Sequence, residues 1–196
     1  MEPKVIRNLA AMRAVNLRDA APQQRERAAE ILVEAMKLFP SAWKDMDSAR
    51  AEVATFLGGD RLALLAIEGS QGAGQVAGWI GAIRHSVHLW ELHPLAVHPD
   101  EQGAGVGAFL IRALEEEARA AGVSTMWLGA DDDFGGTNLF GEDLYPNVLD
   151  RLRQLAPLKS HPCWFYQRLG YTVVGVLPDA TGPGKHDILM AKRITP

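Results

Sequence analysis

Trp90 to Ala130 reads WELHPLAVHPDEQGAGVGAFLIRALEEEARAAGVSTMWLGA, and this stretch decides how the rest of the chain is interpreted. A strand-like apolar run, Leu89 to Val97, ends at the turn signal His98-Pro99-Asp100. A glycine-rich loop with the spacing Q-x-x-G-x-G, Gln102 to Gly107, then opens directly into a helical pattern. Glycines let the backbone approach an anion closely, and the helix behind them directs unpaired N–H groups at the same place. The stretch therefore predicts a binding site for a phosphate or a pyrophosphate.

The helix behind the loop is expected over Ala104 to Ala121, with Gly122 as its stop and a second buried strand at Ser124 to Leu128. Pairs at i,i+4, Arg112–Glu116 and Glu115–Arg119, are expected on its outer side. Spacings of three, four and seven define the apolar face as Val106, Leu110, Ala113, Leu114 and Ala121.

Two common phosphate loops do not fit this pattern. No Lys-Ser or Lys-Thr follows the last glycine, so the loop is not a P-loop for nucleoside triphosphates. A dinucleotide fingerprint would follow a first strand near the start of a βαβ unit, whereas this loop lies in the middle of the chain.

The strand and loop together, with the hydrophobic-x-Val-x-Pro pattern before Q-x-x-G-x-G, resemble the acetyl-CoA loop of the GNAT N-acetyltransferase superfamily. Further segments resemble the aminoglycoside 6′-N-acetyltransferases of the intrinsic enterococcal type. The resemblance covers about residues 12 to 194; its C-terminal half is specific to that branch and its N-terminal half is generic. The segments that carry it are Trp90–Leu95, Leu128–Asp132, His161–Tyr166, Leu169–Tyr171, Val174–Pro178 and Lys185–Lys192.

Composition places the chain among ordinary globular proteins. It has 196 residues, 47% hydrophobic and 22% charged, enough for one domain with a substantial core. A net charge of −4 and a pI near 5.9 argue against a nucleic-acid partner or an anionic membrane and fit a cationic substrate better. The single cysteine, Cys163, excludes an internal disulfide. No apolar run is long enough to span a bilayer, no signal peptide is evident, and a cytoplasmic location is expected.

The chain is expected to form an N-terminal extension, residues 1–11, and a single GNAT domain, residues 12–196. A first strand is predicted at Met12 to Arg18 and a helix from Pro22 that ends at Pro40. Asp47 or Ser48 is expected to cap a short helix that reaches Leu57.

Three strands in a meander follow, at Arg61–Glu68, Gln75–Arg84 and Leu89–Val97, before a parallel crossover through the long helix. Later elements are a helix within Glu142–Gln154, a helix from His161-Pro162 to Gly170, and strands at Tyr171–Leu177 and Asp187–Ile194. The resemblance implies an α/β (α+β) fold, a mixed and mostly antiparallel sheet of about seven strands, split into a V and flanked by helices.

The insertion from Asp131 to Ser160 is acidic at its start, with six acidic residues and no Lys or Arg between Asp131 and Asp150. A solvated loop is one interpretation, and an acidic wall for a polycationic substrate is the other. The resemblance favours the second, because the related enzymes carry acidic residues here. The expected substrate-binding residues are Glu91, Asp131, Asp132, Glu142 and Asp187.

Acetyl transfer from a thioester to an amine needs a held pyrophosphate, a polarised carbonyl, a deprotonated amine and a reprotonated thiolate. The resemblance implies acetyl-CoA as the cofactor. The loop residues expected to hold its pyrophosphate are Gln102, Gly103, Ala104, Gly105, Val106, Gly107 and Ala108.

Pro94 lies inside a strand pattern, where a missing N–H marks a bulge or an edge. A bulge would free the Leu95 N–H to bond the thioester carbonyl, and Val97 would bond the pantetheine arm. The alternative is a proline tolerated on an edge strand.

Glu91 and His93 lie two apart on one strand and so share a face. Glu91 is the preferred base, directly or through a water, or a cation anchor, and His93 is the second candidate. For His93 a histidine bonded within the fold is the simpler interpretation.

Tyr166 occupies the position where the superfamily commonly has a tyrosine near the CoA sulfur, as general acid for the leaving thiolate. An aromatic ring packed on the sheet is the alternative. Cys163 is expected to be buried as a small hydrophobic residue rather than to carry an acetyl group. No histidine spacing suggests a metal.

The function expected from these features is acetyl-CoA-dependent N-acetylation, with the 6′-amine of an aminoglycoside as the named substrate and antibiotic resistance as its consequence. Acetylation of another amine (a polyamine, a small metabolite or a protein) and a non-catalytic acyl-CoA sensor are the alternatives. The resemblance also implies a homodimer, for which Trp43, Trp79 and Trp164 are interface candidates.

Overall fold

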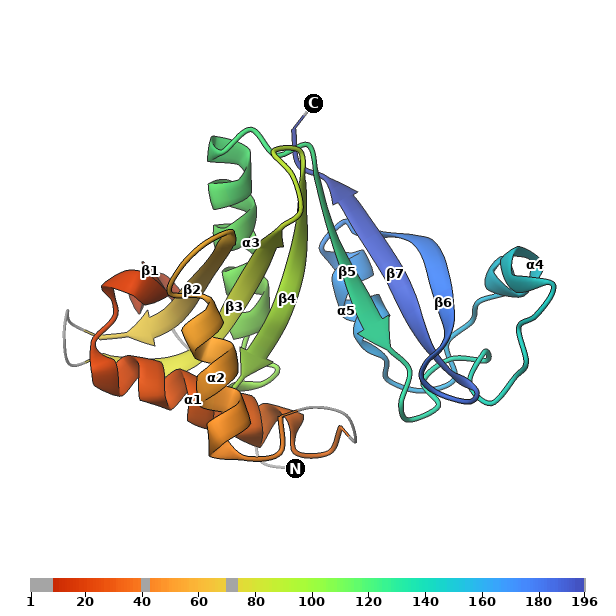
Figure 1. Ribbon diagram of the computed structural model, residues 1–196, viewed down its shortest axis with the longest axis horizontal. Helices are drawn as coiled ribbons and strands as arrows, with labels where there is room; N and C mark the ends of the chain where they lie inside the picture. The colour runs from red at the N-terminus through yellow and green to blue at the C-terminus, as the bar shows by residue number, and fades with distance from the viewer. Residues whose placement is uncertain (1–8, 40–42, 70–73, 196) are drawn as a thin grey trace. The chain divides into compact units, whose positions relative to one another are not determined.

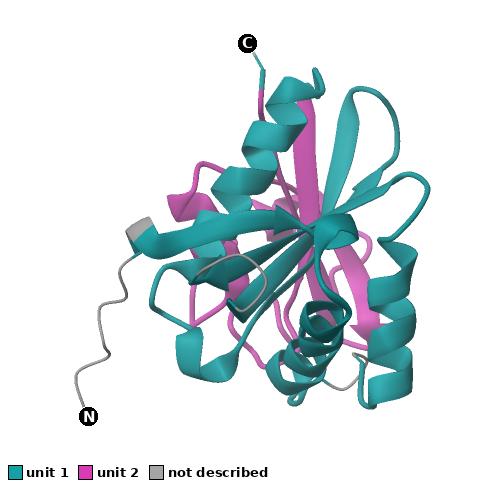
Figure 2. Cartoon of the chain, turned by 90° about the vertical axis from the view of Figure 1, so that its left-hand side faces the viewer, with its two compact units in different colours: residues 1–124, 195 teal, residues 125–194, 196 magenta. Residues whose placement is uncertain are grey.

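The computed structural model describes residues 9–39, 43–69 and 74–195. Its contacts divide the chain into two compact units, residues 1–124 with 195, and residues 125–194 with 196 (Figure 2). Residues 1–8 of the expected N-terminal extension, and Pro40, lie outside the described residues.

The first unit is an antiparallel sheet with helices on both faces (Figure 1). Helices α1 and α2 cover one face, and α3 covers the other. Its strands, in spatial order, are β1 (Met12–Asn16), β2 (Arg61–Glu68), β3 (Gln75–Arg84) and β4 (Leu89–Val97). Its helices are α1 (Pro22–Met36), α2 (Met46–Thr55) and α3 (Val106–Ala120), with short 3-10 turns at η1 (Leu9–Ala11), η2 (Leu17–Asp19) and η3 (Pro99–Glu101).

A hydrophobic core fills the space between this sheet and α1 and α2. Trp79 of β3 is fully buried at its centre, with the Phe56 ring edge-on at 5.6 Å between centroids. Burying two large aromatic rings contributes several kcal/mol to folding. Trp79, an interface candidate from the sequence, is therefore a core residue, and Trp43 packs against the same core.

Strand β4 contains the bulge that Pro94 predicts. The register with β3 shifts between Ile80, which pairs with Leu95, and Ala82, which pairs with Leu92. His93 and Pro94 thus lie opposite the single residue Gly81. A Cβ on Gly81 would overlap the His93 carbonyl oxygen and the Phe56 ring, so the bulge and the aromatic core share a space that only glycine leaves open.

The second unit is a smaller antiparallel sheet in which β7 (Lys185–Arg193) pairs with both β5 (Thr125–Asp131) and β6 (Thr172–Gly182). Two short helices belong to it, α4 (Val148–Leu152) and α5 (Pro162–Arg168).

The buried His186 ring of β7 connects the insertion to this sheet through hydrogen bonds. Its Nδ1 accepts from the Asp179 N–H at 3.2 Å, so Nε2 carries the proton and donates to the carbonyls of Leu139 and Glu142.

Most expected elements are present, and the meander strands have the expected bounds. The cap of α2 was misplaced: it is Asp45, whose carboxylate accepts from the Ser48 N–H at 2.8 Å, and not Asp47 or Ser48. Helix α3 begins two residues later than expected, because Gly105 is left-handed and serves as its N-cap. Gly122, with φ +75°, ends this helix as expected.

The buried face of α3 differs in detail from the expected one. Ile111 and Ala118 are buried on it, whereas Ala121 is exposed. Glu115, expected on the outer side, is buried as well. A helix that packs on a broad sheet buries a wide face and not only a narrow stripe of residues. The spacing of the apolar residues alone does not show how wide that buried face is.

The elements of the second unit are longer or shorter than expected. Only Val148–Leu152 of the expected Glu142–Gln154 helix is helical. Strand β5 runs on to Asp131, and β6 and β7 extend toward each other, which leaves a tight hairpin at Pro183-Gly184. Cross-strand pairing to β7 stabilises these extensions. The expected bounds came from the pattern of apolar residues within each strand, and this pattern does not show which residues pair with another strand.

The expected fold class is confirmed: an α/β fold with a seven-stranded, mostly antiparallel sheet flanked by helices. The V-shaped split and the parallel crossover concern how the two units meet, and they stay predictions, as does the single domain over residues 12–196. No helix among the described residues is both long enough and apolar enough to cross a bilayer.

Gly81→Ala is expected to lower the free energy of unfolding by about 1–3 kcal/mol, because its methyl group overfills the space beside the bulge. Urea denaturation measures the change. Gly58→Ala is the matched control, because a Cβ there meets nothing within 4 Å. Equal stability of the two variants would contradict this account of the bulge.

Candidate functional site

The loop between β4 and α3 forms a cradle of backbone N–H groups. Gly103 and Gly105 have φ angles of +78° and +93°, which L-residues rarely adopt. Gly105 is the N-cap of α3 and has no side chain to cap the helix. Helical geometry therefore leaves the N–H groups of Val106, Gly107 and Ala108 without intrahelical acceptors, at the positive end of a fifteen-residue helix.

Two of the expected loop amides are used inside the loop. The Gln102 N–H donates to the Pro99 carbonyl and the Ala104 N–H to the Glu101 carbonyl, each at 3.3 Å. The cradle that the structure supports is therefore narrower than the sequence predicts. It consists of the amides of Gly103, Gly105, Val106, Gly107 and Ala108.

The backbone of β4 after the bulge has a defined direction. The His98 N–H donates to the Ala77 carbonyl of β3 at 3.0 Å. Backbone groups alternate in an antiparallel pair, so Leu95 and Val97 point their N–H and C=O groups away from β3. The Gln102 side-chain amide takes one of these groups, the Val97 carbonyl, at 3.1 Å. The Leu95 N–H is therefore not used in the pairing of β4 with β3.

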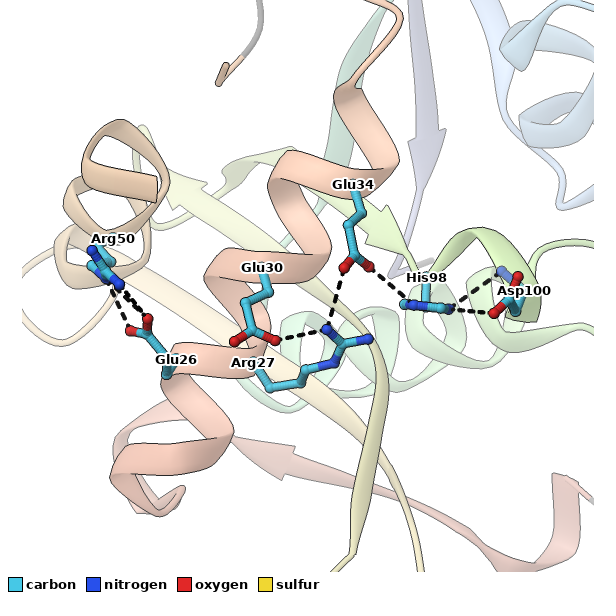
Figure 3. A network of polar contacts seen from close by, with 7 residues as sticks. All are labelled: Glu26, Arg27, Glu30, Glu34, Arg50, His98 and Asp100. Carbon is cyan, nitrogen blue, oxygen red and sulfur yellow. Dashed lines mark hydrogen bonds and ion pairs between the residues drawn. The ribbon is translucent and has the colours of Figure 1, made fainter. Parts of the chain in front are cut away.

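An ion-pair network joins the loop to α1 (Figure 3). The His98 Nε2 lies 3.0 Å from a Glu34 carboxylate oxygen, and its Nδ1 accepts from the Asp100 N–H at 3.3 Å. Arg27 contacts Glu34 at 3.4 Å. The network fixes the turn that starts the loop. The sequence analysis missed Glu34, because no local spacing connects a helix residue with a histidine that lies much later in the chain.

Glu91 and His93 lie on the face of the sheet that α2 covers. Glu91 pairs with Ile83 and His93 lies opposite Gly81, and both partners are on that face. His93 Nε2 is 3.8 Å from Glu52 of α2, and its ring lies 5.7 Å from the Trp43 ring. The Glu91 carboxylate lies 2.7 Å from His85 Nε2. The sequence prediction that Glu91 and His93 share a face is thus confirmed.

Tyr166 lies in the second unit, on α5, in an aromatic group with Phe165 and Tyr171. Burial raises the pKa of its phenol above the ordinary value. The hydroxyl therefore keeps its proton at neutral and mildly alkaline pH and is available as a hydrogen-bond donor.

Cys163 is buried, as expected, and burial raises the pKa of its thiol to about 12. A thiol of this kind is protonated at neutral pH and is a poor nucleophile, which disfavours an acetyl-cysteine intermediate.

His161 caps α5: its ring Nδ1 accepts a hydrogen bond from the Cys163 N–H at 3.2 Å. Burial lowers the pKa of the His161 ring, and Asp132 partly offsets this change.

Asp131 and Asp187 are direct cross-strand partners at the end of β5 and β7. Partners of this kind point to the same face, with Cβ atoms about 5 Å apart. The exposed Gly129 lies two residues before Asp131, and a Cβ on it would overlap the Asp187 carboxylate. Both residues are partly exposed, although the Asp187 Oδ1 atom is buried, and the strand pairing brings them together as a candidate ammonium site.

Asp132 differs from its expected role. It is 1% exposed, and its two carboxylate oxygens accept from the N–H groups of Gly136 and Thr137 and from the Thr137 hydroxyl. These bonds hold the start of the insertion and favour a structural role. Asp133 is also buried, beside Thr181 and Lys185. Glu142 is half exposed, with Arg151 at 3.9 Å.

Comparison with known proteins identifies the class. The model of the acetyltransferase (GNAT) family matches residues 28–141, more than half of the chain. This protein therefore belongs to the GNAT acetyltransferase family. No curated protein sequence matches the chain.

Two solved structures are similar over almost the whole chain. One is an aminoglycoside 6′-N-acetyltransferase in complex with coenzyme A, with 34% identity, a TM-score of 0.82, and coverage of 94% of this chain and 98% of the other. The other is the aminoglycoside 6′-N-acetyltransferase from Enterococcus faecium, with 34% identity, a TM-score of 0.81 and the same coverage. The ribosomal-protein-S18-alanine N-acetyltransferase from Escherichia coli shares the fold, with 17% identity, a TM-score of 0.63, and coverage of 94% of this chain and 95% of the other.

Acetyl-CoA is the cofactor of this family. The residues of the first unit fit it. The cradle at the start of α3 provides several N–H donors for an anionic pyrophosphate, and the glycines keep side chains out of it.

Gly105→Ala is expected to raise the Kd for coenzyme A about tenfold, because a left-handed backbone costs an L-residue about 1–2 kcal/mol. The added Cβ also lies 3.0 Å from the Leu9 side chain. Isothermal titration calorimetry gives the Kd. Gly122→Ala imposes similar strain at the other end of α3, where a Cβ meets nothing, and should leave the affinity unchanged. Equal losses in both variants would assign the effect to general destabilisation.

Glu34→Gln is expected to weaken coenzyme A binding about three- to tenfold, because loss of a bond to a charged group, worth ~1 kcal/mol, loosens the turn before the loop. The same titration measures it. Glu26 lies on the same helix as Glu34, and Glu26→Gln breaks its ion pair with Arg50 of α2 without touching His98 (Figure 3), so this variant serves as the control. An unchanged Kd in Glu34→Gln would show that the network does not position the loop.

Proposed function

We propose that this protein transfers the acetyl group of acetyl-CoA directly to the 6′-amine of aminoglycosides. The observation that carries the proposal is the pairing of Asp131 with Asp187, two partly exposed acidic residues on one face. The similarity at 34% identity to two aminoglycoside 6′-N-acetyltransferases supports the same substrate class. The ammonium groups of a polycationic sugar are suitable ligands for carboxylates on one face.

In the proposed reaction the Leu95 N–H donates to the thioester carbonyl as negative charge develops on its oxygen. Glu91 accepts the proton of the substrate ammonium, directly or through a water, and so frees the amine to attack. His93 is the second candidate for this role. Its neighbours Glu52 and Trp43 favour a role in holding α2 against β4.

Tyr166 is the proposed partner of the leaving sulfur. A free thiol has a pKa of about 8.5, and burial places the pKa of Tyr166 above the ordinary phenol value, so the phenol is the weaker acid. We therefore assign Tyr166 the donation of a hydrogen bond that stabilises the thiolate until it is protonated. Pantetheine would bond the backbone of Val97, through its N–H, since the carbonyl already has the Gln102 amide.

The proposal also includes the substrate contacts, the role in resistance, the location and the oligomeric state that the resemblance implies. Substrate contacts come from Glu91, Asp131, Asp187 and the exposed Glu142, and Asp132 is left to support the loop. Resistance to aminoglycosides, a cytoplasmic location and a homodimer follow from the assignment as proposals.

The deciding experiment is a thiol-release assay with acetyl-CoA and kanamycin, tobramycin, spermidine or short peptides, followed by mass and NMR mapping of the product. Saturable turnover with a 6′-N-acetyl product is expected. Turnover of spermidine or peptides alone would overturn the aminoglycoside assignment and keep the acetyltransferase. Tight coenzyme A binding without turnover of any amine would favour an acyl-CoA sensor.

Asp187→Asn is expected to raise the KM for kanamycin about tenfold or more, because one charge-assisted contact, worth about 1.5–3 kcal/mol, is lost. The KM for acetyl-CoA should stay within twofold. Steady-state kinetics with each substrate varied measures both values. Asp150→Asn, which removes an exposed carboxylate paired with Arg153, is the control. Equal kanamycin KM values in the two variants would place the ammonium elsewhere.

A further inference from the structure

His85 makes a short contact with the proposed base. Its Nε2 lies 2.7 Å from a carboxylate oxygen of Glu91. A carboxylate can only accept, so at this distance Nε2 carries the proton and donates it. This bond occupies one Glu91 oxygen and leaves the other for a substrate ammonium or a water. The sequence gives no sign of the pair, because His85 lies in a turn with no recognised spacing to Glu91.

The turn that carries His85 is itself well held. His85 follows β3 directly, and its N–H and the Ser86 N–H both donate to the Leu89 carbonyl, at 3.1 and 3.2 Å. The Ser86 hydroxyl accepts from the N–H groups of His88 and Leu89, each at 3.1 Å. The backbone beneath the imidazole is therefore fixed. Glu91 gains a partner from a rigid turn rather than from a mobile loop.

The exposed fractions of the two side chains, and the other partners of a neighbouring arginine, also favour the pairing of His85 with Glu91. The Glu91 side chain is 21% exposed and the His85 side chain 42%, so neither group of the pair is fully desolvated. Arg61, which like Glu91 pairs with Ile83, contacts Glu52 at 3.3 Å and the Thr55 hydroxyl at 3.1 Å. A glutamate side chain has three rotatable bonds, and one fixed donor removes much of that freedom.

We infer that His85 is a positioning residue that acts through Glu91: it donates Nε2–H to one carboxylate oxygen and so aims the other at the amine. The inference rests on the proposed function, which makes Glu91 the group that meets the amine. A misplaced catalytic group costs rate even when both substrates still bind, so the effect belongs to the attack of the amine and not to the binding of acetyl-CoA.

The test is a double-mutant cycle with steady-state kinetics, using whichever amine the wild-type protein acetylates. His85→Ala is expected to lower kcat/KM for the amine about 10- to 100-fold and to leave the KM for acetyl-CoA within twofold. His85→Gln keeps a side-chain N–H donor and should retain most of the activity. In a Glu91→Gln background, His85→Ala should cause no further loss.

Two controls separate positioning from folding. His88→Ala removes another histidine of the same turn and should behave as wild type. Imidazole added to His85→Ala should restore part of the rate, because the ring refills its site and donates again. A ring NMR spectrum gives a readout without catalysis: the His85 Nε2–H signal should shift in Glu91→Gln and stay unchanged in His88→Ala.

Three results would overturn the inference: additive losses in the cycle, a His85→Gln variant as impaired as His85→Ala, or equal effects of His85→Ala and His88→Ala. A wild-type protein that acetylates spermidine but no aminoglycoside would overturn the proposed substrate and leave the cycle measurable. Full activity in Glu91→Gln would remove the base assignment and, with it, the role of His85.

Discussion

The bulge at His93 and Pro94, packed on Gly81 and the Phe56 ring, is the constraint on which the functional part of the first unit depends. One extra residue in β4 reverses the alternation of that strand. Before the bulge, Glu91 lies on the face that α2 covers. After it, Ala96 lies on that face and Leu95 does not. Without the bulge, either the glutamate or the Leu95 side chain would lie on the wrong face.

The same bulge links the hydrophobic core to the chemistry. Trp79 and Phe56 bury the centre of the first unit, and the Phe56 ring reaches the space that Gly81 leaves open. The free energy of core packing thus holds a backbone irregularity that would otherwise relax. Strand β4 then enters the loop at a fixed point, where His98 connects it to Glu34 of α1. Packing, bulge and loop form one connected support for the site.

The sequence predicts the parts of this arrangement that depend on neighbouring residues. The meander strands are apolar runs bounded by turn residues, so their ends were predicted to the residue, and Pro94 and the glycines of the loop have steric meanings that hold in any fold. The sequence does not predict which of several acids caps α2, since Asp45, Asp47 and Ser48 all have suitable chemistry and tertiary packing selects one. It also does not separate Asp131 from Asp132. These neighbours differ because a strand pair exposes the first carboxylate and a loop buries the second.

This difference explains why the resemblance is generic in one half of the chain and specific in the other. The cradle expected to hold the pyrophosphate consists of backbone N–H groups, which any sequence can supply if glycines occur at the right φ angles. In the proposed function, recognition of the amine depends instead on individual carboxylates. Apart from Glu91, the carboxylates proposed for this role lie in the second unit, on β5, on β7 and in the insertion between β5 and α5. Cofactor use therefore follows from the family, whereas the proposed substrate depends on a few acidic side chains whose exposure only the fold decides.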